Sequence, residues 1–171
     1  MTGKSNYLSP KELGDSFERR VMRAFERMNY VLVQKNQWNR NYALDKDKAS
    51  KREYDLVMFN TADYQFYIIE CKAHYKPANY VRLEQLAEFS RKLMNHNGTS
   101  ARRVMVTDTD FTRRARKYAE KNNILLVNGK ELERIERKGQ TGVLLTNRIV
   151  RAGLEHLVRG LMKNYFRNGG G

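Results

Sequence analysis

Apolar positions along this chain follow two periods, one typical of helices and one typical of strands. Residues 10–28 carry apolar side chains at helical spacing. Ser9, Pro10 and Glu12 supply an N-cap, a proline at the first helical position and the acidic partner of a capping box. The first helix is therefore predicted over residues 10–28, and it should bury Phe17, Val21, Ala24, Phe25 and Met28.

The middle of the chain changes to the short apolar runs that are typical of strands. Residues 53–59 and 65–73 are separated by the turn-prone sequence at 60–63, which predicts a β-hairpin. A strand over residues 30–34 precedes them, and the polar residues 35–52 should form a long connection or an irregular β-excursion. Long connections are often functional, and this one leads directly into the hairpin.

Helices and strands alternate in the second half. The expected elements are helices over 81–94, 111–121 and 130–137, the second of them capped from within 108–110, and strands over 104–107 and 124–127. Strands in this order need parallel crossovers. The fold class is thus predicted to be α/β, with a mixed central sheet flanked by helices on both faces.

An additional C-terminal helix is expected over residues 146–166, after a linker at 139–142. Its apolar stripe must be covered, either by the core or by a partner subunit. The predicted organisation is one core domain over residues 1–138, followed by the linker and helix at 139–171.

The chain is strongly basic, with 33 Lys and Arg against 19 Asp and Glu, a formal net charge of +14. A folded domain of this charge favours a polyanionic partner, most commonly nucleic acid. The single cysteine excludes a disulfide framework and favours a reducing compartment. No apolar run approaches the ~20 residues that span a bilayer. We expect an intracellular protein, cytoplasmic or nucleoid-associated, encoded by a host, a virus or a mobile element.

Charged residues interrupt the two strands of the predicted hairpin. Because side chains alternate along a strand, Glu70 and Lys72 should lie on one face of the sheet. Burying a charge is costly unless it is paired or binds a metal. Asp55 brings a further acid from the neighbouring strand, so Asp55, Glu70 and Lys72 predict a magnesium-dependent nuclease centre. The alternative for this spacing is a structural ion pair.

This arrangement resembles the PD-(D/E)XK nuclease superfamily, and within it the Mrr-type endonucleases and archaeal Holliday-junction resolvases. The matching positions are Glu18 in the opening helix, Asp55, the E-x-K of Glu70 and Lys72, and Gln85 in the helix that follows. The resemblance extends over residues 14–135. Tyr54 stands where the superfamily name has proline, at a position that is not a ligand.

The resemblance implies an endodeoxyribonuclease that uses Mg²⁺, with Mn²⁺ able to substitute. The implied metal ligands are Asp55, Glu70, the backbone carbonyl of Cys71 and Glu18. Lys72 would orient the attacking water or stabilise developing charge, and Gln85 would position Lys72 or a phosphate oxygen. Oxygen ligands of this kind suit Mg²⁺.

Basic residues near the predicted centre are expected to contact DNA phosphates. They are Lys46, Lys48, Lys51, Arg52, His74, Lys76, Arg113, Arg114 and Lys117. A compact basic domain with no reader domain favours branched DNA, such as Holliday junctions, over sequence-specific duplex DNA, and two cuts favour a homodimer. The alternative function is a non-catalytic nucleic-acid-binding or assembly protein that retains the nuclease fold.

Overall fold

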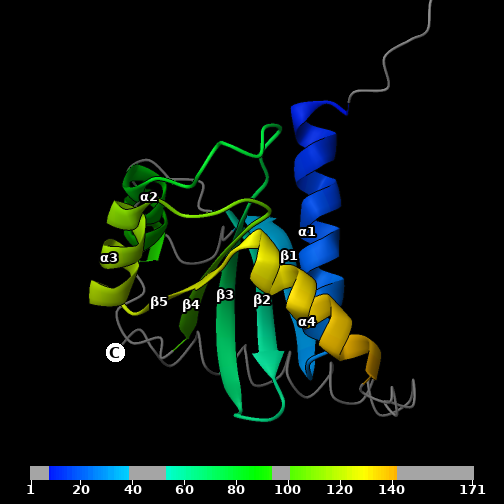
Figure 1. Ribbon diagram of the computed structural model, residues 1–171. Coiled ribbons are helices and arrows are strands. Elements are labelled where there is room, and N and C mark those ends of the chain that lie inside the picture. The colour runs from blue at the N-terminus through cyan, green and yellow to red at the C-terminus, as the bar shows by residue number, and fades with distance from the viewer. Residues whose placement is uncertain (1–7, 39–52, 94–100, 142–171) are drawn as a thin grey trace, which may run out of the picture.

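The computed structural model describes residues 8–38, 53–93 and 101–141, which form one mixed sheet with helices on both faces (Figure 1). The strands are β1 (Tyr30–Trp38), β2 (Glu53–Asn60), β3 (Gln65–Lys72), β4 (Arg102–Thr107) and β5 (Ile124–Val127). The helices are α1 (Pro10–Glu26), α2 (Leu83–Leu93), α3 (Arg113–Lys121) and α4 (Gly129–Thr141). None of these helices is long and apolar enough to cross a membrane.

The five strands lie in chain order across the sheet. β1, β2 and β3 pair antiparallel, whereas β3, β4 and β5 pair parallel through crossovers that contain α2 and α3. This confirms the predicted α/β fold with a mixed sheet. The antiparallel half is a meander, whereas the parallel half needs helical crossovers.

Two apolar clusters fill the space between the sheet and its helices. One lies under α2 and α3 and contains Phe66, Ile68 and Phe89 among its buried residues. The other lies under α1 and α4 and contains Phe17, Val21 and Ile69. Ile68 and Ile69 are neighbours in β3 but belong to different clusters, as the alternation of side chains along a strand requires.

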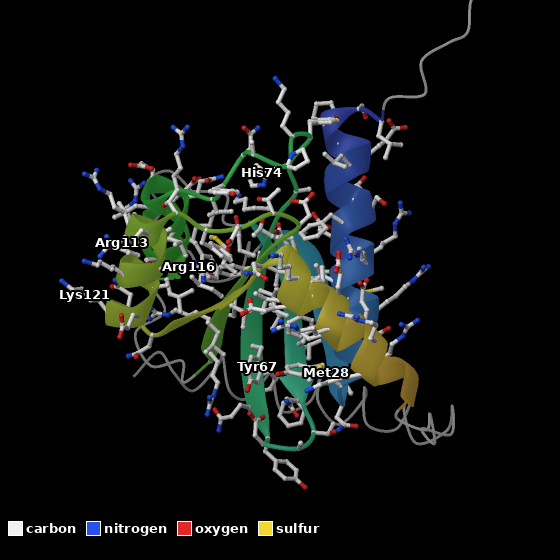
Figure 2. The ribbon with its side chains drawn as sticks, in the orientation of Figure 1. Met28, Tyr67, His74, Arg113, Arg116 and Lys121 are labelled. Atoms are coloured by element: carbon white, nitrogen blue, oxygen red, sulfur yellow. The ribbon has the colours of Figure 1, made fainter. Side chains whose placement is uncertain are left out.

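The start of α1 is as predicted, and its end is not. Ser9 accepts a hydrogen bond from Glu12 N, and the Glu12 carboxylate accepts one from Ser9 N, so the capping box is present. The helix ends at Glu26, and Asn29 adopts a positive φ of 66° that turns the chain into β1. Met28 consequently lies outside the helix and is 39% exposed, contrary to the prediction that it is buried (Figure 2).

Other element boundaries also differ from the predictions: α2 begins at Leu83 rather than at residue 81, and β4 begins at Arg102 rather than at residue 104. β1 continues to Trp38, because it pairs with β2 as far as Glu53. Thr112 caps α3 in place of the acids at 108–110, and its side chain accepts a hydrogen bond from Ala115 N. α4 reaches Thr141 and includes part of the expected linker, since a glycine costs a helix only ~1 kcal/mol. The predicted helix at 146–166 lies outside the described residues.

β3 extends beyond its pairing with β2, and this feature positions the charged residues. The β2–β3 ladder ends at Leu56 and Ile69, whereas the β3–β4 ladder continues to Lys72 and Thr107. The end of β3 therefore pairs with β4 but not with β2, which leaves room on the β2 side for side chains from β2 and α2.

Candidate active site

Glu70 is a buried carboxylate with two cationic neighbours. It is 2% exposed, in the part of β3 that lies beyond the β2 ladder. Its Oε1 lies 2.8 Å from Lys72 Nζ and 2.9 Å from Lys92 Nζ. Its Oε2 is buried and accepts no hydrogen bond from any residue that the structure describes. Because a buried oxygen without a partner is costly, Oε2 is a position that a cation or a donor would stabilise.

Lys92 was not predicted as a site residue. It lies in the last turn of α2, and the hydroxyl of Tyr54 donates a hydrogen bond to its backbone oxygen at 3.2 Å. Its position three residues after buried Phe89 places it beside the buried stripe of α2, but this spacing alone does not identify Glu70 as its partner. In the folded protein its side chain reaches Glu70, two residues before the end of β3.

Asp55 approaches the same end of β3 from β2. Its Oδ2 accepts a hydrogen bond from Cys71 N at 2.6 Å. Burial raises its pKa to about 7, and repulsion from Glu70 and Glu18 adds to the effect, while the Cys71 hydrogen bond and Lys72 oppose it. Asp55 thus exchanges a proton near neutral pH, and its carboxylate is destabilised by its surroundings when it is charged.

Lys72 stays protonated despite its partial burial. Desolvation lowers its pKa, but attraction to Glu70, the hydrogen bond with Glu70 and the charges of Asp55 and Glu88 outweigh it, so the net effect is a raised pKa. Its side chain is 28% exposed, which leaves the ammonium accessible from solvent. Lys72 therefore presents a fixed positive charge beside Glu70.

Glu18 and Cys71 complete the surroundings of Asp55. Glu18 Oε2 lies 3.6 Å from Lys35 Nζ on β1, and its charge is close enough to raise the pKa of Asp55. The Cys71 side chain packs against the apolar cluster under α1 and α4, where burial raises the thiol pKa. Cys71 therefore faces the site with its backbone and keeps its thiol protonated.

Gln85 has a local structural role in α2. Its Oε1 accepts a hydrogen bond from Arg82 N at 2.9 Å, the interaction by which a third-position glutamine closes the N-terminus of a helix. The predicted contact with Lys72 is not among the hydrogen bonds of the described residues. The oxygen of Gln85 thus caps the helix in this arrangement.

The residues predicted to contact DNA fall into three groups. Arg113, Arg114 and Lys117 lie exposed on α3, and Figure 2 shows Arg113 pointing away from the sheet. His74 follows β3, where its backbone N donates to Asp108, and Lys76 is exposed two residues later. Lys46, Lys48, Lys51 and Arg52 lie outside the described residues.

The donor set at this end of the sheet suits a hard divalent cation. No three His, Cys, Asp or Glu side chains within the described ranges are arranged as a ready metal cluster. Mg²⁺ does not require one, since it is commonly held by one or two carboxylates with several waters. Asp55 and the unpartnered oxygen of Glu70 satisfy that requirement, and the repulsion that raises the pKa of Asp55 is what a cation would relieve.

Comparison with known proteins identifies similar sequences and folds. The chain matches the Mrr_cat family, described as a restriction endonuclease, over residues 11–135. None of the curated proteins matches it. Among solved structures, the protein of unknown function AF1548 is 22% identical with a TM-score of 0.51, covering 90% of this chain and 88% of that one. The MspJI restriction endonuclease, solved in complex with a 27-mer oligonucleotide, is 14% identical with a TM-score of 0.51 and covers 89% of this chain but 38% of that one.

Proposed function

From the premise that this chain belongs to the Mrr-type restriction endonuclease family, we propose that it is a metal-dependent DNA endonuclease. The family match spans most of the chain and confirms the resemblance to the PD-(D/E)XK nucleases. The observation that carries the proposal is the buried Glu70, with one oxygen unpartnered, beside an Asp55 whose pKa is raised to about 7. A purely structural ion pair has no need of the second acid.

Mg²⁺ is the proposed cofactor, with Mn²⁺ able to replace it. Asp55, Glu70 and the backbone carbonyl of Cys71 would hold it, and Glu18 would support a second position or a water. A bound divalent cation would neutralise the charge of the scissile phosphate and make a water nucleophilic near neutral pH. The burial of Glu70 and the hydrogen bond from Cys71 N to Asp55 support this assignment.

The two lysines have different proposed roles. Lys72 would place its ammonium against the phosphate oxygens and stabilise the charge that develops in the transition state. Lys92 is a positioning residue: its contact with Glu70 Oε1 would fix the carboxylate and leave the unpartnered Oε2 available to a cation. Both side chains are about three-quarters buried, at 28% and 25% exposure, so their charges are less screened than surface charges.

The substrate is proposed to be DNA, with branched DNA favoured over linear duplex, and the acting form a homodimer. The net charge of +14 supports a phosphate-dominated interface. A two-fold assembly would place two centres against two strands. In this proposal residues 1–138 form the nuclease core, and residues 139–171 cover either the core or the partner subunit.

Nicking of supercoiled plasmid tests the proposal. Wild type, Asp55→Asn and Lys72→Ala are compared with Mg²⁺ and with Mn²⁺, and Lys121→Ala, an exposed lysine at the end of α3, is the control. We expect nicking by wild type and control, and loss of at least 100-fold for both site variants, as is typical for removal of one charge-stabilising group. Equal nicking by all four proteins would refute the assignment of the site.

A second function, non-catalytic nucleic-acid binding, is favoured by one observation. Lys72 and Lys92 both form ion pairs with Glu70 Oε1, so this carboxylate has cationic partners within the chain itself. Under this function the wild type binds plasmid and junction DNA but cuts neither with Mg²⁺ or Mn²⁺. The same nicking assay, run beside a binding titration, separates the two functions.

A further inference from the structure

A basic hollow lies between α1 and α4, apart from the residues described above. Its volume is about 440 Å³, and its lining residues are Ser16, Arg19, Arg20, Arg23, Arg27 and Glu136. The two helices pack side by side over the same face of the sheet (Figure 1). We call this hollow the α1–α4 groove.

The groove carries an excess of positive charge. Four guanidinium groups face one carboxylate, so three positive charges are not neutralised by the lining itself. Arg19 and Arg23 are exposed and form no ion pair with any residue in the described ranges. Unpaired arginines gathered in a concave surface attract an anion more strongly than the same charges spread over a convex surface.

One arginine of the groove is fixed in place. Arg20 Nε and one terminal nitrogen donate hydrogen bonds of 2.8 and 2.9 Å to the two oxygens of Glu136, a bidentate pair. This pair joins α1 to α4 across 116 residues of sequence and holds the two walls of the groove at a defined separation. The groove is therefore organised before any ligand enters.

The spacing of the arginines suits a repeating anion. Ser16, Arg20, Arg23 and Arg27 follow helical spacing along one stripe of α1, with Arg19 beside it. The stripe is about 16 Å long at 1.5 Å per residue, which is the axial length of roughly five phosphates of one DNA strand. A small anion would contact one or two of these groups, whereas a nucleic-acid backbone contacts them all.

The groove lies on the opposite side of the sheet from Glu70. Glu70 points toward α2, as its contact with Lys92 requires, whereas the groove is formed by the helices that cover the other face. We propose that the α1–α4 groove binds the phosphate backbone of a second DNA segment, such as another arm of a branched substrate. The choice of DNA as the ligand rests on the proposed nuclease function, whereas the existence of the groove does not.

Salt-dependent binding tests the inference without cleavage. A labelled four-way junction is titrated in EDTA at several salt concentrations with wild type and with Arg19→Gln/Arg23→Gln. The matched control is Arg102→Gln/Lys130→Gln, which removes two exposed charges outside the groove. Log affinity decreases as log salt concentration increases. We expect this decrease to become shallower by about 2 in slope in the groove variant, because each lost phosphate contact contributes ~0.9.

An unchanged slope in the groove variant would overturn the inference. An equal change of slope in the groove variant and the control would also overturn it, because the effect would then depend only on the net charge of the protein. Plasmid nicking by wild type is measured separately. Its absence would refute the proposed nuclease function and leave the result for the groove standing.

Discussion

Replacing Asp55 by asparagine should stabilise the metal-free protein above neutral pH while removing its activity. The amide keeps an oxygen that accepts the hydrogen bond from Cys71 N, so the geometry of the site is retained. It removes the charge that burial, Glu70 and Glu18 make unfavourable. Sites that hold such charges for function are expected to be less stable than their neutralised variants.

The size and sign of this effect follow from the raised pKa of Asp55. The ordinary value is 3.8, and the folded value is about 7, so the folded protein holds the proton more tightly than the unfolded chain. Stability is therefore highest below pH 4 for this group and is lost as pH rises to 7, because the unfolded chain releases its proton first. At 1.36 kcal/mol per pH unit the full loss is about 4 kcal/mol, of which ~2–3 kcal/mol falls between about pH 5 and pH 8.

Thermal unfolding in EDTA measures the effect. The difference in Tm between Asp55→Asn and wild type should grow by roughly 4–12 °C from about pH 5 to pH 8, given ~2–4 °C per kcal/mol for a chain of this size. Asp15→Asn on α1, the same chemical change outside the site, is the control. If Asp55→Asn and wild type change in parallel across this range, Asp55 is ionised at little cost and the account of its pKa is wrong.

Three further outcomes are expected. Single-turnover cleavage should rise with pH and level off above about pH 7, because the proton on Asp55 competes with the cation; a rate constant that is flat from about pH 6 to 8 contradicts this. Lys92→Met should lower the free energy of unfolding in urea by about 1–2 kcal/mol, because it leaves buried Glu70 with one cation. This loss should be smaller in the Glu70→Gln background, and equal losses in both backgrounds would show that the two residues are not coupled. Arg20→Ala and Glu136→Ala should show a coupling of only about 0.5–1 kcal/mol in a double-mutant cycle, since their side chains are 40% and 26% exposed; a coupling near zero would mean that the pair does not hold α1 to α4.

The β2–β3 hairpin and the neighbouring positions of Asp55 and Glu70 could be predicted because they depend on local patterns. Alternation along residues 65–73 places Glu70 and Lys72 on the face of Ile68, and the structure has Ile68 in the cluster under α2. A tight hairpin fixes the register of β2 against β3, so residues equally distant from the turn face each other, as Val57 and Ile68 do. One turn thus determines which acids meet.

Lys92 and the α1–α4 groove could not be predicted because they depend on packing between distant segments. The end of α2 lies over Glu70 only once the helix has docked on the sheet, and no spacing in the sequence fixes which turn reaches it. The groove depends on the pairing of Arg20 with Glu136 across 116 residues. The boundary at Met28 failed for a different reason, because the turn at Asn29 ended the helix before its apolar pattern ended.

The charges at the end of β3 show which acid of the proposed site lacks a nearby cation. Three acids, Glu18, Asp55 and Glu70, meet three lysines at 35, 72 and 92. Glu18 and Glu70 each have a lysine within 4 Å, whereas Asp55 has no ion pair with any residue that the structure describes, accepts a hydrogen bond from Cys71 N, and has a pKa raised by burial. A proton on Asp55 therefore substitutes for the missing positive charge. In the proposed metal-dependent enzyme, that proton would leave near pH 7 and a divalent cation would take its place, while both lysines kept their contacts with Glu70 Oε1.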